Sequence, residues 1–167
     1  MKTRCAASAQ GLGVPVFVFN DGELSQIAQA QTLATGGFKS TTAAIGLGNK
    51  TTVSQAESYN ELYFDQNGSD NILISDQRGT GNLVQGSSNG TGNSAEFDQS
   101  GSGNQAYTAQ LYGSDNMITV KQADTMNVAY VTQGGSGNQA LVDQSGANMS
   151  ATVQQFGTAN QASVLQQ

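Results

Sequence analysis

Two stretches of the chain decide its fold: residues 99–110 read QSGSGNQAYTAQ and residues 133–144 read QGGSGNQALVDQ. In each, Gln is followed by Gly-x-Gly-Asn, Ala comes two residues after that Asn, and Gln returns six residues after it. Variants of this phrase recur along most of the 167 residues at a spacing of about 11. A fixed period of this kind indicates a repeat architecture.

The repeat predicts two columns of stacked amide side chains. Steps of 10 or 12 residues occur near Asn116, Asn148 and Asn160, and Ser88 replaces Gln in one unit. The extra residues are expected in the turns at 110–116 and 154–160. The predicted Asn ladder consists of Asn49, Asn60, Asn71, Asn82, Asn93, Asn104, Asn116, Asn127, Asn138, Asn148 and Asn160. The predicted Gln ladder consists of Gln55, Gln66, Gln77, Gln99, Gln110, Gln122, Gln133, Gln144, Gln154 and Gln166.

The segments between Asn and Gln read as β-strands. Small or apolar residues recur at the second and fourth positions after Asn, as at Leu62 and Phe64, while the positions between them are mostly polar. This period of two places Asn, the two apolar positions and Gln on one inward face. A right-handed coiled coil also has an 11-residue period. It is excluded because Gly-rich segments in every period would break a helix.

Two strands and two Gly-rich turns make one coil of about 22 residues, with coils ~4.8 Å apart. Eleven strands run from Asn49 to Gln166, and FKSTTAA (38–44) reads as a twelfth that lacks its Asn and Gln. The predicted fold is therefore an all-β, two-sheet β-solenoid of about six coils that stacks into amyloid fibres. Residues 38–167 form this repeat domain, and residues 1–37 are expected to be a separate N-terminal segment, poorly ordered or used for targeting.

Composition and charge restrict the class of function. Leu, Ile, Val and Phe make up about 19% of the chain, whereas Asn and Gln number 14 and 20. Such a chain orders by stacked backbone and amide hydrogen bonds more than by an oily core. Residues 51–167 carry a net charge of −8 (Arg78 and Lys121 against ten acids), which argues against nucleic acid as a partner.

The N-terminal region shows no complete targeting signal. The apolar run from Val14 to Phe19 is short and contains Pro15, so neither a signal peptide nor a transmembrane helix is evident. Cys5 is the single cysteine, which excludes an intrachain disulfide.

The repeated phrase Gln-x-Gly-x-Gly-Asn-x-Ala-x-x-x-Gln, as in 99–110 and 133–144, resembles the curlin repeat of bacterial curli subunits. The resemblance covers roughly residues 38–167. Departures from the pattern are Ser88, and Asp124 with Thr125 where Gly is expected. The resemblance implies a secreted structural subunit of an extracellular, cell-surface functional amyloid, exported across the outer membrane, that serves biofilm matrix, adhesion and surface attachment. The implied partners are further copies of the chain, a nucleating subunit and an outer-membrane secretion channel.

Two other readings stay open at this stage. One is a monomeric, capped β-solenoid that binds ice or a glycan, although the outward columns lack the regular Thr array of an ice-binding face. The other is a nucleating subunit instead of a major subunit. The last segment, NQASVLQQ, ends as a complete strand with no capping feature, which favours end-to-end polymerisation.

The outward faces suggest one regulatory element. On one sheet, the column five residues after Asn reads Ser54, Asp76, Asp98, Lys121, Asp143 and Leu165, and Lys121 is placed between two acids. Asp76, Asp98 and Asp143 are predicted gatekeepers that slow premature assembly. On the other sheet, the column three residues after Asn reads Tyr63, Gln85, Tyr107, Tyr130 and Ala151.

No catalytic, metal or cofactor site is predicted. The chain has no His and one Cys, and its acids are mostly isolated. NGSDN (67–71) and GSDN (113–116) are faintly similar to calcium-binding β-rolls, but those need a nine-residue Gly-Gly-x-Gly-x-Asp period. The sequence therefore predicts a structural protein and not an enzyme.

Overall fold

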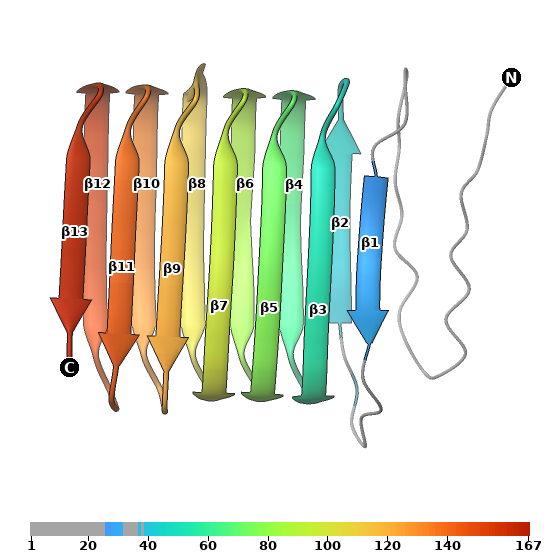
Figure 1. Cartoon of the computed structure of the whole chain (residues 1–167), viewed down its shortest axis with the longest axis vertical. Coiled ribbons are helices and arrows are strands. Elements are labelled where there is room, and N and C mark those ends of the chain that lie inside the picture. The colour runs from blue at the N-terminus through green and yellow to red at the C-terminus, as the bar shows by residue number, and fades with distance from the viewer. Residues whose placement is uncertain (1–25, 32–36, 38) are drawn as a thin grey trace, which may run out of the picture.

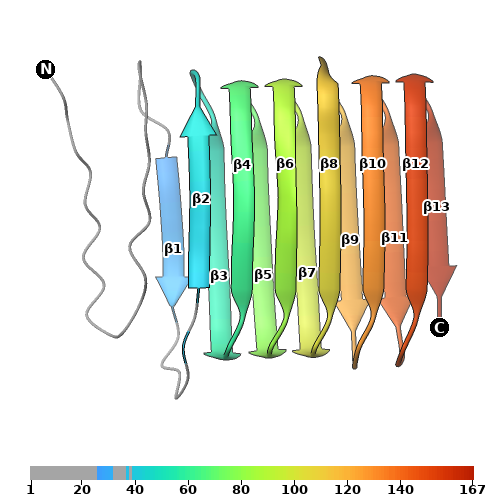
Figure 2. The ribbon, with the colours of Figure 1, turned by 180° about the vertical axis from the view of Figure 1, so that it is seen from behind.

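The computed structural model describes residues 26–31, 37 and 39–167. All the secondary-structure elements in these residues are β-strands. The chain winds into two parallel sheets that face each other, so the predicted two-sheet β-solenoid of about six coils is confirmed (Figures 1 and 2). Cys5 and the apolar run 14–19 lie outside the described residues.

Strands alternate between the two sheets along the chain. The seven-stranded sheet, here called the odd sheet, contains β1 (Gln26–Gln31), β3 (Lys50–Ser58), β5 (Ile72–Thr80), β7 (Ser94–Ser102), β9 (Met117–Ala123), β11 (Gln139–Ser145) and β13 (Gln161–Gln166). The six-stranded even sheet contains β2 (Lys39–Ile45), β4 (Glu61–Ser69), β6 (Leu83–Thr91), β8 (Gln105–Ser114), β10 (Val128–Ser136) and β12 (Ser150–Thr158).

Each strand pairs in parallel with the strand one coil away, so contacting residues are mostly 22 apart, as for Asp76 and Asp98. The register slips by one residue where β6 pairs with β8, because β8 carries a bulge near Tyr112. This bulge is the extra residue predicted at 110–116. The prediction of a second extra residue at 154–160 is wrong, because β10 and β12 pair without interruption from Val128 with Ser150 to Ser136 with Thr158.

The core is a thin layer of small and apolar side chains between the sheets. Leu62, Leu73, Val84 and Ile118 are fully buried. Phe64 and Phe97 meet edge to face across the core, with ring centroids 6.0 Å apart. Gly86 leaves room beside Phe64, because a Cβ added there would lie 2.7 Å from the Phe64 ring and 2.4 Å from the Thr108 hydroxyl. Gly86 therefore offsets the bulk of Phe64 at the neighbouring level of the column.

The corners of the coil require left-handed backbone. The residue three before most of the inward Asn residues has a positive φ, +101° at Gly79 and +112° at Gly68. A Cβ added at Gly79 would lie 2.0 Å from the carbonyl oxygen of Gly101 in the next coil. Glycine is therefore required there both by the backbone angle and by the close stacking of corners. Glu57 and Asp124 take the equivalent position at two other corners, with φ +74° and +68°.

β1 lies within residues 1–37, which the sequence analysis set apart from the repeat region. It pairs in parallel with β3, from Gln26 opposite Lys50 to Gln31 opposite Gln55. The two sheets together therefore contain thirteen strands among the described residues, one more than the twelve that the repeat pattern predicted.

Candidate functional site: amide columns and open edges

Asn side chains stand in two columns at the corners where strands begin. Asn49, Asn71, Asn93, Asn116, Asn138 and Asn160 precede strands of the odd sheet, and Asn60, Asn82, Asn104 and Asn127 precede strands of the even sheet. All but Asn160 are buried. Each buried Asn side chain lies in a corner where backbone N–H and carbonyl groups can pair with its amide.

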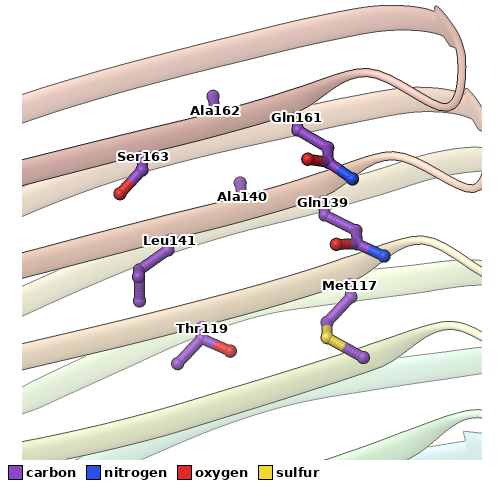
Figure 3. Close-up of a pocket in the computed structure, with 8 residues that line it drawn as sticks. All are labelled: Met117, Thr119, Gln139, Ala140, Leu141, Gln161, Ala162 and Ser163. Atoms are coloured by element: carbon purple, nitrogen blue, oxygen red, sulfur yellow. The ribbon is translucent and has the colours of Figure 1, made fainter.

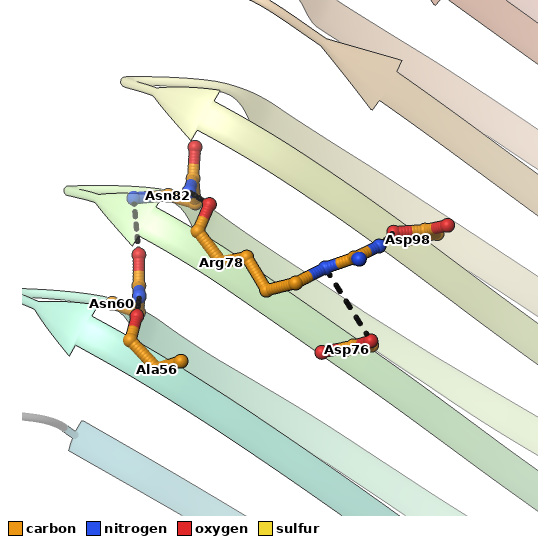
Figure 4. Close-up of polar contacts among 6 residues, drawn as sticks. All are labelled: Ala56, Asn60, Asp76, Arg78, Asn82 and Asp98. Carbon is orange, nitrogen blue, oxygen red and sulfur yellow. Dashed lines mark hydrogen bonds and ion pairs between the residues drawn. The ribbon is translucent and has the colours of Figure 1, made fainter. Parts of the chain in front are cut away.

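The Asn amide bonds mainly to backbone, which corrects the expected amide-to-amide contact. The Oδ1 atom of Asn60 accepts from the backbone N–H of Asn82 at 3.0 Å. Its Nδ2 donates to the carbonyl oxygens of Ala56 (2.7 Å) in the same coil and Gly79 (2.9 Å) in the next. Figure 4 shows Asn60 and Asn82 repeating this arrangement at successive levels. Direct contacts between Asn amides occur only along 93, 116, 138 and 160 in the part of the chain that the structure describes.

Gln side chains form the true amide ladder. In the odd sheet, the Nε2 of Gln77 donates to the Oε1 of Gln99 at 3.0 Å, and Gln99 donates to Gln122 at 2.8 Å. Gln77 also donates to the carbonyl oxygen of Glu61, which starts a strand of the even sheet. Each Gln therefore links coils along the axis and braces one sheet against the other.

The odd-sheet ladder runs from Gln55 through Gln77, Gln99, Gln122 and Gln144 to Gln166. The even-sheet ladder is interrupted. The Ser88 hydroxyl donates to the Oε1 of Gln110 at 2.8 Å. The Oε1 of Gln66 accepts from the hydroxyl of Thr51 in the odd sheet and not from a Gln of its own sheet. Ala44 takes the first position, because it pairs with Gln66. The even sheet therefore has the weaker column at its N-terminal end.

The structure corrects the predicted ladders at Asn148 and Gln154. Asn148 is exposed, has φ +58° and occupies the left-handed position before the column. Met149 stands in the column, and its N–H donates to the Oδ1 of Asn127 at 3.0 Å. Gln154 faces outward, and Gln155 accepts from Gln133 at 2.9 Å.

The physical reason is that stacking fixes the step between levels. From Asn138 to Met149 and from Met149 to Asn160 the step is 11 residues, so no coil is shortened or lengthened there. A strict period was the signal that would have selected Met149 and Gln155 over their polar neighbours.

The last residue of the outward column of the even sheet also differs from the predicted one by one position. β12 presents Thr152 beside Tyr130, and the predicted Ala151 is buried. Tyr107 and Tyr130 stack at neighbouring levels, with ring centroids 5.1 Å apart and planes 10° from parallel. Gln85 separates Tyr63 from Tyr107, so the aromatic ladder extends over two levels.

A cation that was not part of the predicted column, Arg78, lies beside the charged column of the odd sheet. Arg78 bonds Asp98, and its Nε lies 3.5 Å from Asp76, so one guanidinium bridges two stacked carboxylates (Figure 4). This hydrogen bond and the charges of both Asp residues raise the pKa of Arg78. Lys121 lies between Asp98 and Asp143 in register.

Close to the N-terminal end, Lys39 donates to Glu61 at 2.9 Å on the surface of the even sheet. This hydrogen bond and the charge of Glu61 raise the pKa of Lys39 above its ordinary 10.5. The pair therefore adds to stability up to about pH 10.5 and loses its effect as the pH rises through the raised pKa.

A hollow on the described surface contains no group suited to acid–base chemistry. This shallow hollow on the outer face of the odd sheet lies over β9, β11 and β13 and includes Met117, Leu141 and Ser163 (Figure 3). None of its lining residues is ionisable. Among the described residues there is no group of three His, Cys, Asp or Glu placed to hold a metal ion. In that part of the chain no helix is long and apolar enough to span a membrane.

The C-terminal end of the solenoid is an open edge. β12 and β13 are the last strands of their sheets, and no described element covers them (Figures 1 and 2). Gln166 accepts from Gln144 but donates only to the carbonyl oxygen of Ser150, and Asn160 is exposed. Among the described residues, no donor meets the Oδ1 of Asn160. The last coil therefore presents the same unpaired backbone and amide groups that every inner coil uses to hold its neighbour.

A family model for the curlin associated repeat matches residues 90–123, which include β7, β8 and β9. This match confirms the resemblance to the curlin family. None of the curated proteins searched matches the chain significantly.

Proposed function

We propose, from the curlin associated repeat that the chain carries and from the solenoid built on it, that the protein is a curli-like structural subunit that polymerises end to end. The fibre would be an extracellular functional amyloid that serves biofilm matrix, adhesion and surface attachment. The observation that carries the proposal is the edge formed by β12 and β13, which no described element covers and which presents the same groups that join the inner coils. Ordinary solenoids end in capping elements that prevent this kind of pairing.

The interior of the chain supports the same conclusion. Successive coils are joined by parallel backbone pairing, by the Asn bonds to backbone and by the Gln ladder. Each of these contacts joins donors and acceptors of one coil to those of the next coil. A second copy of the chain presents the same donors and acceptors. A cross-β fibre continues this bonding between chains at a spacing of ~4.8 Å.

By resemblance to curli systems, the partners are a nucleating subunit and an outer-membrane secretion channel, and export across the outer membrane places the fibre at the cell surface. No catalytic step, metal or cofactor is part of the proposal. We place the chain with the major subunits and not the nucleators, because Gly-Asn recurs up to Asn138 and Gln recurs up to Gln166.

The experiment is incubation of purified chain, followed by thioflavin fluorescence and fibre diffraction. We expect a lag, then growth, and a meridional reflection near ~4.8 Å. A chain that stays monomeric and soluble, with no such reflection, contradicts the proposal and favours a monomeric binding solenoid.

A further inference from the structure

The two sheets contain different numbers of strands, seven in the odd sheet and six in the even sheet. Because strands alternate between the sheets, a whole number of coils needs an even number of strands. The strands from β2 to β13 make six whole coils, and β1 is the additional strand.

This additional strand matters for end-to-end stacking. If two copies stack with β1 in place, β13 of one copy meets β1 of the next in the odd sheet. In the even sheet, β12 and the next β2 are then two strand spacings apart, about 9.6 Å, with an empty strand position between them. Backbone groups of both strands would face that position without partners, which is costly inside a fibre.

Without β1, both sheets continue at one strand spacing. β13 pairs with β3 of the next copy, and β12 pairs with its β2. We therefore infer that β1 is an exchangeable edge strand: it covers β3 in the free chain, and β13 of a second copy displaces it. This inference rests on the proposed end-to-end polymerisation.

The registers show why β13 is the better partner of β3. β1 places Gln29 opposite Val53 and Gln31 opposite Gln55. At the level of Val53, the strands β7, β9, β11 and β13 carry Phe97, Val120, Val142 and Val164. β13 therefore offers an apolar residue at the register position where β1 has Gln29, and Gln166 of β13 already belongs to the odd-sheet ladder.

The first coil is also the least well satisfied inside. Ser40 and Thr42 are buried in β2, and within the described residues their hydroxyl groups have no hydrogen-bond partner. Ala44 follows them where other coils have Gln or Ser. Opening of the N-terminal end therefore disrupts fewer favourable contacts than opening of any inner coil.

A disulfide between β1 and β3 tests the inference directly. The residues Ala28 and Thr52 are paired in register, and neighbouring strands lie within the Cα separation that a disulfide spans. In a C5S background, the variant A28C/T52C locks β1 in place when oxidised and releases it when reduced. We expect the oxidised protein to lose fibre elongation and the reduced protein to elongate as the C5S chain does.

The matched control is C5S with T52C and I74C. Thr52 and Ile74 are paired in register between β3 and β5, so the disulfide joins two inner strands and leaves β1 free. Oxidised and reduced forms of this control should elongate equally. Oxidised A28C/T52C chain, added in minor proportion to C5S chain, should stop growth at one fibre end only, because its open β12–β13 edge still docks.

Two results would overturn the inference. One is equal elongation by oxidised and reduced A28C/T52C. The other is loss of elongation on deletion of residues 1–25, because that segment would then supply the strand missing from the even sheet; we expect this deletion to elongate normally and deletion of 1–31 to shorten the lag. Failure of the proposed function gives a different pattern, in which the wild-type chain and every reduced variant stay monomeric.

Discussion

Asn and Gln are not interchangeable in this chain, because their side chains reach different partners. The shorter Asn amide bonds backbone at its own corner and at the corner of the next coil. The longer Gln amide reaches the next Gln and the opposite sheet. The two amide types therefore have separate tasks: Asn fixes the turn, and Gln fixes the stacking of coils and the sheet spacing.

Replacing Asn82 by Ala should destabilise the chain strongly. Asn82 accepts from the N–H of Asn104 and donates to the carbonyl oxygens of Arg78 and Gly101, so the substitution leaves backbone groups without partners. Each buried group left unpaired costs about 1–3 kcal/mol. Denaturant unfolding of freshly purified monomer measures the loss, and Asn148→Gly is the control, because Asn148 is exposed at φ +58° and should change stability little. Similar losses in both variants would contradict the assigned register.

Gln154 and Gln155 give a second test of register at adjacent positions. Gln155→Ala removes the acceptor of Gln133 and the donor to the carbonyl oxygen of Gln139, so it should lower the free energy of unfolding by about 1–3 kcal/mol. Gln154→Ala alters an exposed side chain and should stay within about 0.5 kcal/mol. The opposite order of effects in denaturant unfolding would place Gln154 in the ladder.

At the scale of the element, the corner is the most constrained part of each coil. Its glycine carbonyl oxygens accept from the Asn of the preceding coil, and its Cα atoms lie against the next corner. The strands tolerate Ala, Val, Leu, Ile and Phe inside, because large residues are offset by small ones, as Gly86 offsets Phe64.

Gly79→Ala and Gly81→Ala separate close stacking from backbone strain. Both glycines have positive φ, +101° and +69°. An added Cβ would lie 2.0 Å from the Gly101 carbonyl oxygen at Gly79 but meets nothing within 4 Å at Gly81. Gly81→Ala should therefore cost about 1–2 kcal/mol from the left-handed backbone alone, and Gly79→Ala distinctly more. Equal melting temperatures for the two variants would show that corners do not stack as closely as described.

The elements themselves were predictable from sequence, and the exceptions have identifiable causes. The alternation of Asn, Leu62, Phe64 and Gln66 indicates both the strand and its inward face. Asn148 and Gln154 were misplaced because residue type was weighed above spacing. The Asn bonds to backbone were not predictable, because they depend on the corner geometry. β1 was not recognised because Ser25 precedes it where the repeat has Asn, and Gln29 stands where the repeat has its second apolar residue.

At the scale of the whole molecule, charge controls how readily copies meet. The chain carries a net charge of −6 at pH 7 and has a pI near 4.2. Arg78 already bridges Asp76 and Asp98, so the repulsion expected along this column is partly offset within the folded chain. Asp143 is the predicted gatekeeper nearest the open edge, since β11 pairs with β13.

Fibre formation should accelerate as the pH falls from 8 to 4.5, because the net negative charge that separates copies decreases toward the pI. Asp143→Asn should shorten the thioflavin lag at pH 8, whereas Arg78→Gln should lengthen it by leaving Asp76 and Asp98 unbridged. High salt should reduce both differences. Equal lag times at pH 4.5 and 8 would contradict a role for the carboxylates.

The uniform 22-residue separation of contacts has a consequence for how such a protein changes length. Removal of residues 60–81 joins Tyr59 to Asn82 and deletes one coil, yet the odd-sheet Gln ladder stays continuous, since Gln55 then meets Gln99, and the main loss on the surface is the ion pair of Lys39 with Glu61. We expect this deletion variant to fold with a β-rich circular dichroism spectrum and still to form fibres. A deletion of 11 residues, by contrast, moves all later strands to the opposite sheet. Tandem duplication or loss of whole coils is therefore a neutral route by which the length of such a chain can evolve, and half-coil changes are not.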